Sequence, residues 1–216
     1  MATGAEAVVV EGSNTVRVTD SHLTGTKNRG VMIYQSFSGD AQGQEGRFSE
    51  TGGSLSALDG PLFFVTNTDA LIELTDTKLS ETSGVLLDAA ASAWGTSGSN
   101  GGNVTLRATH EVLSGAVTVD DISTAVLELN DGTVLTGSIN AAGSAKGVTV
   151  VLDKTSKWYV TADSYLTVLE DSANLTGSKV SNIIGDGHTV YYDKSANTSL
   201  GGKSYSLVGG GTLKPA

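Results

Sequence analysis

Apolar and polar residues alternate along short stretches of the chain, and one such stretch recurs. In the clearest copy, residues 16–25, two valines two positions apart precede a small polar corner and then Leu23, Thr24 and Gly25. Residues 72–80 repeat this pattern position for position, and further copies begin at positions 48, 106 and 127. Alternation with a period of two is typical of β-strands, and Gly, Asn and Asp favour turns. The pattern predicts an all-β chain of short strands separated by tight corners.

The repeat spacing favours one β architecture over another. A β-sandwich gives no reason for repeated sequence patterns, whereas a parallel solenoid stacks like residues over like residues, about 4.8 Å apart. Parallel crossovers are nearly always right-handed. We therefore expect residues 1–216 to form a single domain, a right-handed parallel β-helix (solenoid) with about three short strands per rung.

Stacked copies would place their apolar pairs in buried ladders. We expect one ladder to contain Val16 and Val18, Ile72 and Leu74, Leu127 and Leu129, and Trp158 and Val160. The recurrent Leu of each copy, such as Leu23, would form a second ladder at the next corner.

The repeated Val-x-Val-Thr-Asp-x-x-Leu-Thr-Gly pattern in a background rich in Gly, Ser, Thr and Asn resembles pectate-lyase-like and pertactin-like right-handed β-helices. The C-terminal part is similar to repeat domains of bacterial secreted or surface adhesin-like proteins, through residues 158–161, 164–166, 183–193 and 207–213. The resemblance implies a module of a larger exported protein. β-Helices of this kind include polysaccharide lyases, which use clustered carboxylates, and adhesins without catalytic activity.

Charge and composition narrow the range of partners. The formal net charge is −10, which disfavours nucleic acid and anionic membrane surfaces as partners. No apolar run approaches 18 residues, so we expect no membrane span. The N-terminus lacks the basic and apolar start of a signal peptide. With no cysteine, thiolate metal sites and thiol nucleophiles are excluded.

Motifs for catalysis and cofactor binding are missing. No G-x-S-x-G, Walker A or dinucleotide-binding motif is present, and no acidic segment matches a calcium-binding loop. His22 and His110 are predicted to lie on turns or outward faces. His188 could pair with Asp186 as an acid–base unit, but a tight turn explains Asp186-Gly187 better. We therefore expect no catalytic residues, metal or cofactor.

Aromatic side chains are the best candidates for ligand binding, because they can stack on sugars. Trp94 lies in an insertion, residues 92–102, and Tyr159 and Tyr165 are expected to face outward or to cover an edge. Trp158 is expected in the core. A second insertion spans residues 37–45.

These features favour a non-catalytic structural or adhesive module of a bacterial surface or secreted protein, with a glycan or host-surface ligand and an extracellular or cell-surface location. The alternative is a polysaccharide lyase or glycoside hydrolase. Ice binding would need regular threonine rows, which the irregular spacings disfavour.

The N-terminal apolar stretch, Ala7 to Val10, has no polar cap before it. Open strand edges pair readily with other strands. We therefore expect either a preceding rung or end-to-end self-association at this end.

Overall fold

Short strands account for nearly all the regular structure of the chain. The computed structural model describes residues 1–37 and 45–216. These residues form 23 β-strands and two 3-10 turns, η1 (Ser172–Asn174) and η2 (Thr198–Leu200). The all-β prediction is confirmed.

The first of three sheets contains seven strands. Its long strand β3 pairs with β5 through its first half and with β6 through its second half, and β1 runs along both halves. The strands are β1 (Ala2–Glu11), β3 (His22–Tyr34), β5 (Ser54–Ala57), β6 (Phe63–Thr66), β8 (Lys78–Glu81), β9 (Val85–Ala89) and β12 (Ala116–Val119).

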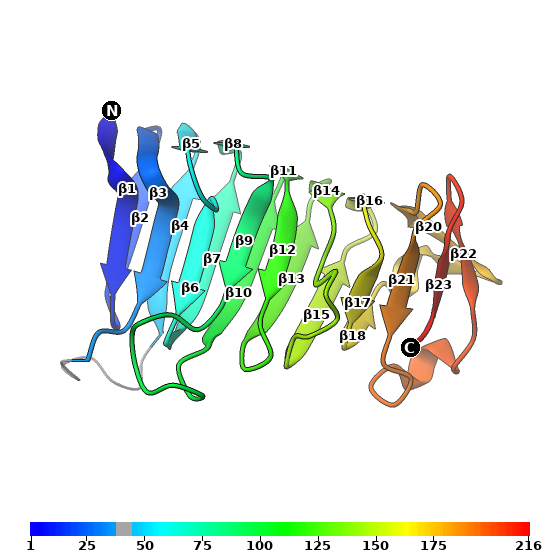
Figure 1. Cartoon of the computed structure of the whole chain (residues 1–216). Coiled ribbons are helices and arrows are strands. Elements are labelled where there is room, and N and C mark those ends of the chain that lie inside the picture. The colour runs from blue at the N-terminus through cyan, green and yellow to red at the C-terminus, as the bar shows by residue number, and fades with distance from the viewer. Residues whose placement is uncertain (38–44) are drawn as a thin grey trace.

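The second sheet also has seven strands, and all of them are parallel and follow one another in chain order. Figure 1 shows them side by side along the length of the molecule, from the N-terminal end toward the C-terminal end. They are β2 (Thr15–Thr19), β4 (Gly46–Thr51), β7 (Thr68–Thr75), β10 (Gly102–Thr109), β13 (Thr124–Asn130), β15 (Gly147–Leu152) and β18 (Val168–Glu170).

The third sheet has nine strands and contains antiparallel as well as parallel pairs. Its strands are β11 (Val112–Ser114), β14 (Val134–Gly137), β16 (Lys157–Val160), β17 (Ser164–Leu166), β19 (Leu175–Thr176), β20 (Lys179–Ile184), β21 (Thr189–Tyr192), β22 (Tyr205–Val208) and β23 (Thr212–Pro215).

The prediction of a single right-handed parallel β-helix with about three short strands per rung is wrong. The strands divide into three sheets of 7, 7 and 9 strands, and β19–β20 and β22–β23 pair in opposite directions. Gly177, at φ +61°, separates the first antiparallel pair, and Gly209 to Gly211, all at positive φ, separate the second. Glycine adopts such angles without steric penalty, so the chain can reverse direction there. The repeat pattern showed which strands resemble one another but not these reversals.

The predicted alignment of apolar positions is present in the second sheet. Phe48, Ile72, Leu106 and Leu127 occupy matching positions on successive strands, and all four are fully buried. Val16 is aligned with Phe48 at the N-terminal edge of the row. Burying an aliphatic side chain of this size contributes about 1.5–3 kcal/mol, so this row is a large part of the core.

Trp158 does not belong to that row. It lies in the third sheet between Leu135 and Ile183. It is fully buried, as predicted, and its indole Nε1 donates a hydrogen bond of 2.8 Å to the carbonyl oxygen of Gly137. Leu135 is itself aligned with Leu113, so Trp158 takes the place of the recurrent leucine rather than of the first apolar pair.

The corners after the strands of the second sheet share one backbone conformation. Asp20, Asp76, His110 and Asp131 directly follow β2, β7, β10 and β13, with φ between +46° and +56°. Asp and His are among the few non-glycine residues that enter this left-handed region with some frequency. The Asp-rich corners of the sequence repeat therefore mark sharp turns.

The two ends of the molecule differ. Strand β1 pairs only with β3 and β2 only with β4 in the part of the chain that the structure describes. Val8 and Val16 are only half-buried, although their strand neighbours Val31 and Phe48 are fully buried. At the other end, β22 and β23 pair with each other, and the Asn197 side chain accepts a hydrogen bond from the backbone of β18. The N-terminal end is open and the C-terminal end is covered.

Candidate binding groove

The segment that carries Trp94 is held firmly against the strands. It connects β9 to β10, and the Asn100 side-chain amide donates hydrogen bonds to the carbonyl oxygens of Ser92, at 2.8 Å, and Trp94, at 2.7 Å. The backbone of Asn67 donates a further bond of 3.0 Å to Asn100. These bonds fix the position of Trp94 on the body of the molecule.

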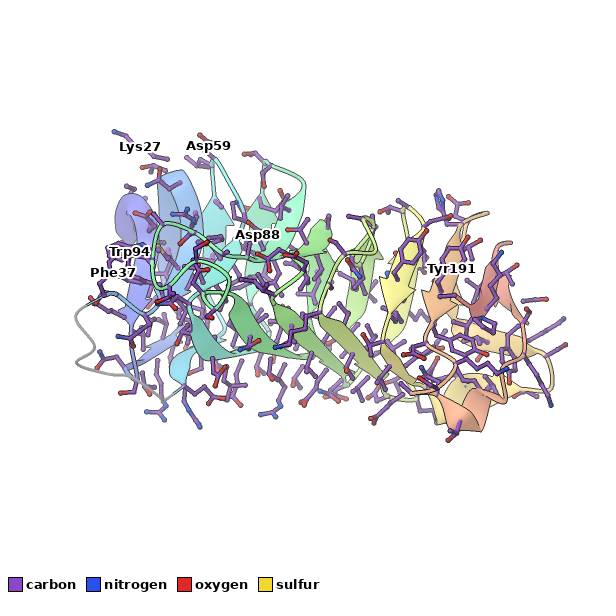
Figure 2. All side chains as sticks on the ribbon, turned by 60° about the horizontal axis from the view of Figure 1, so that its bottom comes forward. Lys27, Phe37, Asp59, Asp88, Trp94 and Tyr191 are labelled. Atoms are coloured by element: carbon purple, nitrogen blue, oxygen red, sulfur yellow. The ribbon has the colours of Figure 1, made fainter. Side chains whose placement is uncertain are left out.

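The Trp94 ring lies against two other aromatic rings. Its centroid is 4.9 Å from that of Tyr34, at the end of β3, and 5.7 Å from that of Phe37, with tilted planes in both cases. Figure 2 shows Trp94 and Phe37 together at one end of the molecule. Phe37 is 66% exposed, whereas Trp94 is half-buried. The accessible aromatic surface therefore belongs mainly to Phe37. Residues 38–44 of the predicted second insertion lie outside the described residues.

A groove of about 430 Å³ opens beside this cluster. Its lining consists of amide, hydroxyl and carboxylate side chains, with glycine backbone and one aromatic ring. The lining residues are Gln35, Ser36, Phe37, Asn67, Thr68, Asp69, Gly95, Thr96, Ser99, Gly101 and Asn103.

The polar side chains of the groove are positioned by neighbouring strands. Asp69 on β7 and Asn103 on β10 are paired in register, and the Asn103 amide donates a 2.9 Å hydrogen bond to Asp69. The Asn103 oxygen accepts a bond of the same length from Thr124 on β13. Asn67, at φ +55°, donates its amide to the carbonyl oxygen of Gln35. Fixed amides and carboxylates beside an aromatic ring suit a ligand with many hydroxyl groups.

The other two predicted ligand residues lie elsewhere. Tyr165 on β17 stacks on Tyr191 of β21, with centroids 4.6 Å apart and planes within 7°. Gly143 lies so close to the other face that an added Cβ would be 3.3 Å from the ring. Lys214 lies over the Tyr191 ring at 5.1 Å. Tyr165 therefore offers a ligand its edge rather than a free face.

Tyr165 borders a second cavity, of about 590 Å³, near the C-terminal residue. The cavity is lined by Asn140, Gly143, Ala145, Tyr165, Leu166, Thr167, Asp193, Lys194, Ser195 and Ala216.

Tyr159, on β16 between Thr136 and Ile184, is 39% exposed and lines neither of these spaces. Figure 2 shows Trp94 well apart from Tyr191, the stacking partner of Tyr165. The structure therefore does not bring the three predicted residues together.

The histidines occupy surface positions. His22 bonds to Ser54 at 2.8 Å, and His110 bonds to Asp76 at 2.5 Å. Asp76 raises the pKa of His110 through that hydrogen bond and its negative charge. His188 lies 3.8 Å from Asp163, while Asp186 and Gly187 form a turn at positive φ. The turn interpretation of Asp186-Gly187 is confirmed. Among the described residues, no group of three or more His, Asp or Glu side chains could hold a metal ion.

The sequence analysis singled out none of the groove residues outside the Trp94 segment as a ligand residue, and the ones on which the site depends are Phe37, Asn67, Asp69 and Asn103. A signal for the last two exists in the repeat, because Asp69 and Asn103 each precede the aligned apolar pair by three residues. Phe37 has no such signal, since it follows its strand in an irregular segment.

Comparison of the chain with protein families, with curated proteins and with solved structures found no match. The resemblance to adhesin-like repeat domains therefore stays a prediction from the sequence repeat. In residues 1–37 and 45–216, no helix is long and apolar enough to cross a membrane.

Proposed function

We propose that this chain is a non-catalytic adhesive module of a bacterial surface or secreted protein, and that it binds carbohydrate in the groove beside Trp94. The observation that carries the proposal is the exposed Phe37 ring, supported by Trp94 and Tyr34, at the border of a groove lined by amides and hydroxyls. Sugars present apolar C–H faces to aromatic rings and hydroxyls to amides and carboxylates.

The charges of the groove refine the ligand class. Asp69 is the one ionisable side chain among the described residues that line it. An acidic sugar would meet that carboxylate and the overall charge of −10. A neutral oligosaccharide is therefore favoured over an acidic one.

A glycan array with the whole chain tests the function. Phe37→Ala should weaken binding of a neutral glycan about two- to tenfold, in line with about 0.5–1.5 kcal/mol for an aromatic contact. Adding Asn103→Ala to Phe37→Ala should weaken glycan binding further than Phe37→Ala alone. Val112→Ala is the matched control, because Val112 is 73% exposed on another sheet. Tyr159→Ala and Tyr165→Ala test the other two predicted ligand residues.

Two results would overturn the proposal. One is binding that survives both Phe37→Ala and Asn103→Ala. The other is release of new reducing or unsaturated sugar ends from a polysaccharide, which would make the chain a hydrolase or lyase.

End-to-end self-association is the second part of the proposal. The unpaired edges of β1 and β2 and the half-buried Val8 and Val16 support it, because a second copy would cover all of them. Sedimentation velocity over a range of protein concentrations measures it.

A further inference from the structure

Two glutamates are buried at one corner of the molecule. Glu50, on β4, is aligned between Val18 and Leu74 in the inward-facing row, and it is 1% exposed. Glu111, which follows the corner residue His110, is 2% exposed. Glutamates are almost never fully buried without a partner that compensates their charge.

The hydrogen bonds of this pair are incomplete. One carboxylate oxygen of Glu111 accepts a 2.7 Å bond from the backbone N–H of Thr77. The other Glu111 oxygen and both carboxyl oxygens of Glu50 are buried without a hydrogen-bond partner. The ion pairs of the described residues join Arg29, Arg47, Arg107, His110 and His188 to other acids, so none neutralises either glutamate.

Nearby charges do not compensate the pair either. Arg17, Glu73 and Arg107 are level with Ser49, the residue before Glu50, so they stand on the opposite face of the second sheet. Asp76 and His110, at the exposed corners, act on Glu111 in opposite directions.

Two ionised carboxylates cannot share this interior. Burial raises the pKa of both glutamates to about 7, and the negative charge of Glu111 adds to the effect on Glu50. The N–H of Thr77 opposes the shift at Glu111, because it stabilises the ionised carboxylate. Glu111 is therefore the better acceptor and Glu50 the better carrier of a proton.

Thr77 links the two residues, because its hydroxyl donates to the backbone carbonyl oxygen of Glu50 at 3.3 Å and its N–H donates to the Glu111 carboxylate. We propose that Glu50 and Glu111 form an internal site at this corner that binds one proton. When the site empties, the proton leaves to water and two negative charges remain in the interior. The corner formed by Thr77 and Glu111 is then the part of the fold that loosens.

The direction of the pH effect follows from proton binding. An unfolded glutamate titrates near its ordinary value of 4.5, and the folded pair holds its proton to about pH 7. The folded state thus binds more protons between these values, so the stabilisation is complete below about pH 4.5 and is lost as the pH rises through 7.

Urea unfolding of the whole chain between pH 5 and pH 8.5 tests the site. The unfolding equilibrium constant of the wild type should rise with pH, by up to about tenfold per pH unit for one proton. Glu50→Gln, which resembles the protonated acid, should flatten this dependence. Glu170→Gln, at an exposed glutamate, should keep the wild-type slope. Burial raises the pKa of Asp171 to about 6, so Asp171 also contributes to the pH dependence. Because the wild type and both variants contain it, its contribution is the same in all three and does not affect the comparison of their slopes.

Carbon NMR of the glutamate carboxyls provides a measurement on the folded wild type, independent of the variants. One glutamate carboxyl should remain protonated near neutral pH. Equal slopes in wild type and Glu50→Gln, or the titration of every glutamate near its ordinary value, would refute the proposal. Stabilisation by Ca²⁺ at pH 8 that Glu50→Gln abolishes would also refute it, since the pair would then hold a metal ion.

Discussion

At the scale of single residues, the shape of the groove depends on a glycine, Gly95, where no larger residue would fit. Gly95 has φ +76°, and an added Cβ would lie 2.1 Å from the Asn67 side-chain oxygen. Asn67 in turn holds the carbonyl of Gln35. The close approach of Gly95 therefore fixes two sides of the groove relative to each other.

Gly95→Ala should displace this contact and weaken glycan binding, while it costs about 1–2 kcal/mol of stability for the left-handed backbone alone. Gly98→Ala is a matched control, because Gly98 has φ +84° in the same segment but nothing within 4 Å of an added Cβ. We expect similar backbone strain in both variants and a larger total loss in Gly95→Ala. Binding isotherms and urea unfolding measure the two effects, and equal glycan affinity in both variants would contradict this role of Gly95.

Trp158→Phe should destabilise the chain by about 2 kcal/mol, because it leaves the buried carbonyl of Gly137 without its donor and opens space in the core. Tyr159→Phe, at the next residue on the outward side of β16, should change stability by less than about 0.5 kcal/mol. Chemical denaturation followed by circular dichroism compares the two. A loss at Trp158 no larger than that at Tyr159 would contradict the buried position.

At the scale of elements, charges bridge three strands of the second sheet. Arg107 on β10 contacts Glu73 on β7 at 2.8 Å and Glu128 on β13 at 2.6 Å. These bonds raise the pKa of Arg107. The side chain is 42% exposed, so water and salt weaken the interaction.

Arg107→Ala should therefore cost no more than about 1 kcal/mol at low ionic strength, and less in high salt. Arg17→Ala, on β2 level with Ser49, removes an arginine that has no such partners in the described structure. Thermal unfolding at two salt concentrations separates them. A loss at Arg107 that does not shrink in high salt would show that packing, not charge, dominates.

Sequence predicted the strands better than their assembly. The row from Phe48 to Leu127 follows from alternation and repeat spacing, since each copy must bury the same face. The position of Trp158 in another sheet does not follow, because alternation marks a residue as buried but does not say whether it continues the first apolar pair or the recurrent leucine, with which it is aligned. The antiparallel hairpins at Gly177 and at Gly209 to Gly211 could not be predicted, because a glycine indicates a turn but does not show whether the next strand runs parallel or antiparallel to the previous one.

The sequence indicated one segment near the candidate groove but not the groove itself. Trp94 was singled out because a tryptophan in a polar insertion is conspicuous, and in the structure it supports Phe37 rather than lining the groove. Phe37 and Asn103 come to line one groove only through the pairing of distant segments. The row of Thr19, Thr51, Thr75 and Thr109, aligned on four strands, was also hidden by unequal intervals in the sequence. Which residues of two strands lie side by side depends on how the strands pair. Connections of unequal length prevent this register from being read directly from the sequence.

At the scale of the whole molecule, the proposed self-association depends on the uncovered N-terminal end. Val8→Lys should reduce end-to-end association, because it places a charge in the half-buried surface that a second copy would cover. Val112→Lys, at an exposed valine of the third sheet, should leave association unchanged. Sedimentation velocity measures both. Monomers at every concentration, or equal association in the two variants, would contradict this use of the N-terminal end.

The pairing of β22 with β23 limits how far such association can proceed. In the described residues, the C-terminal end carries this paired hairpin, whereas β1 and β2 at the N-terminal end each have a partner on one side alone. Two copies that meet through identical surfaces form a closed, two-fold symmetric pair. Growth would then stop at the dimer, and such a pair would carry two copies of the candidate groove on one body, so that a ligand with repeated units could meet both at once.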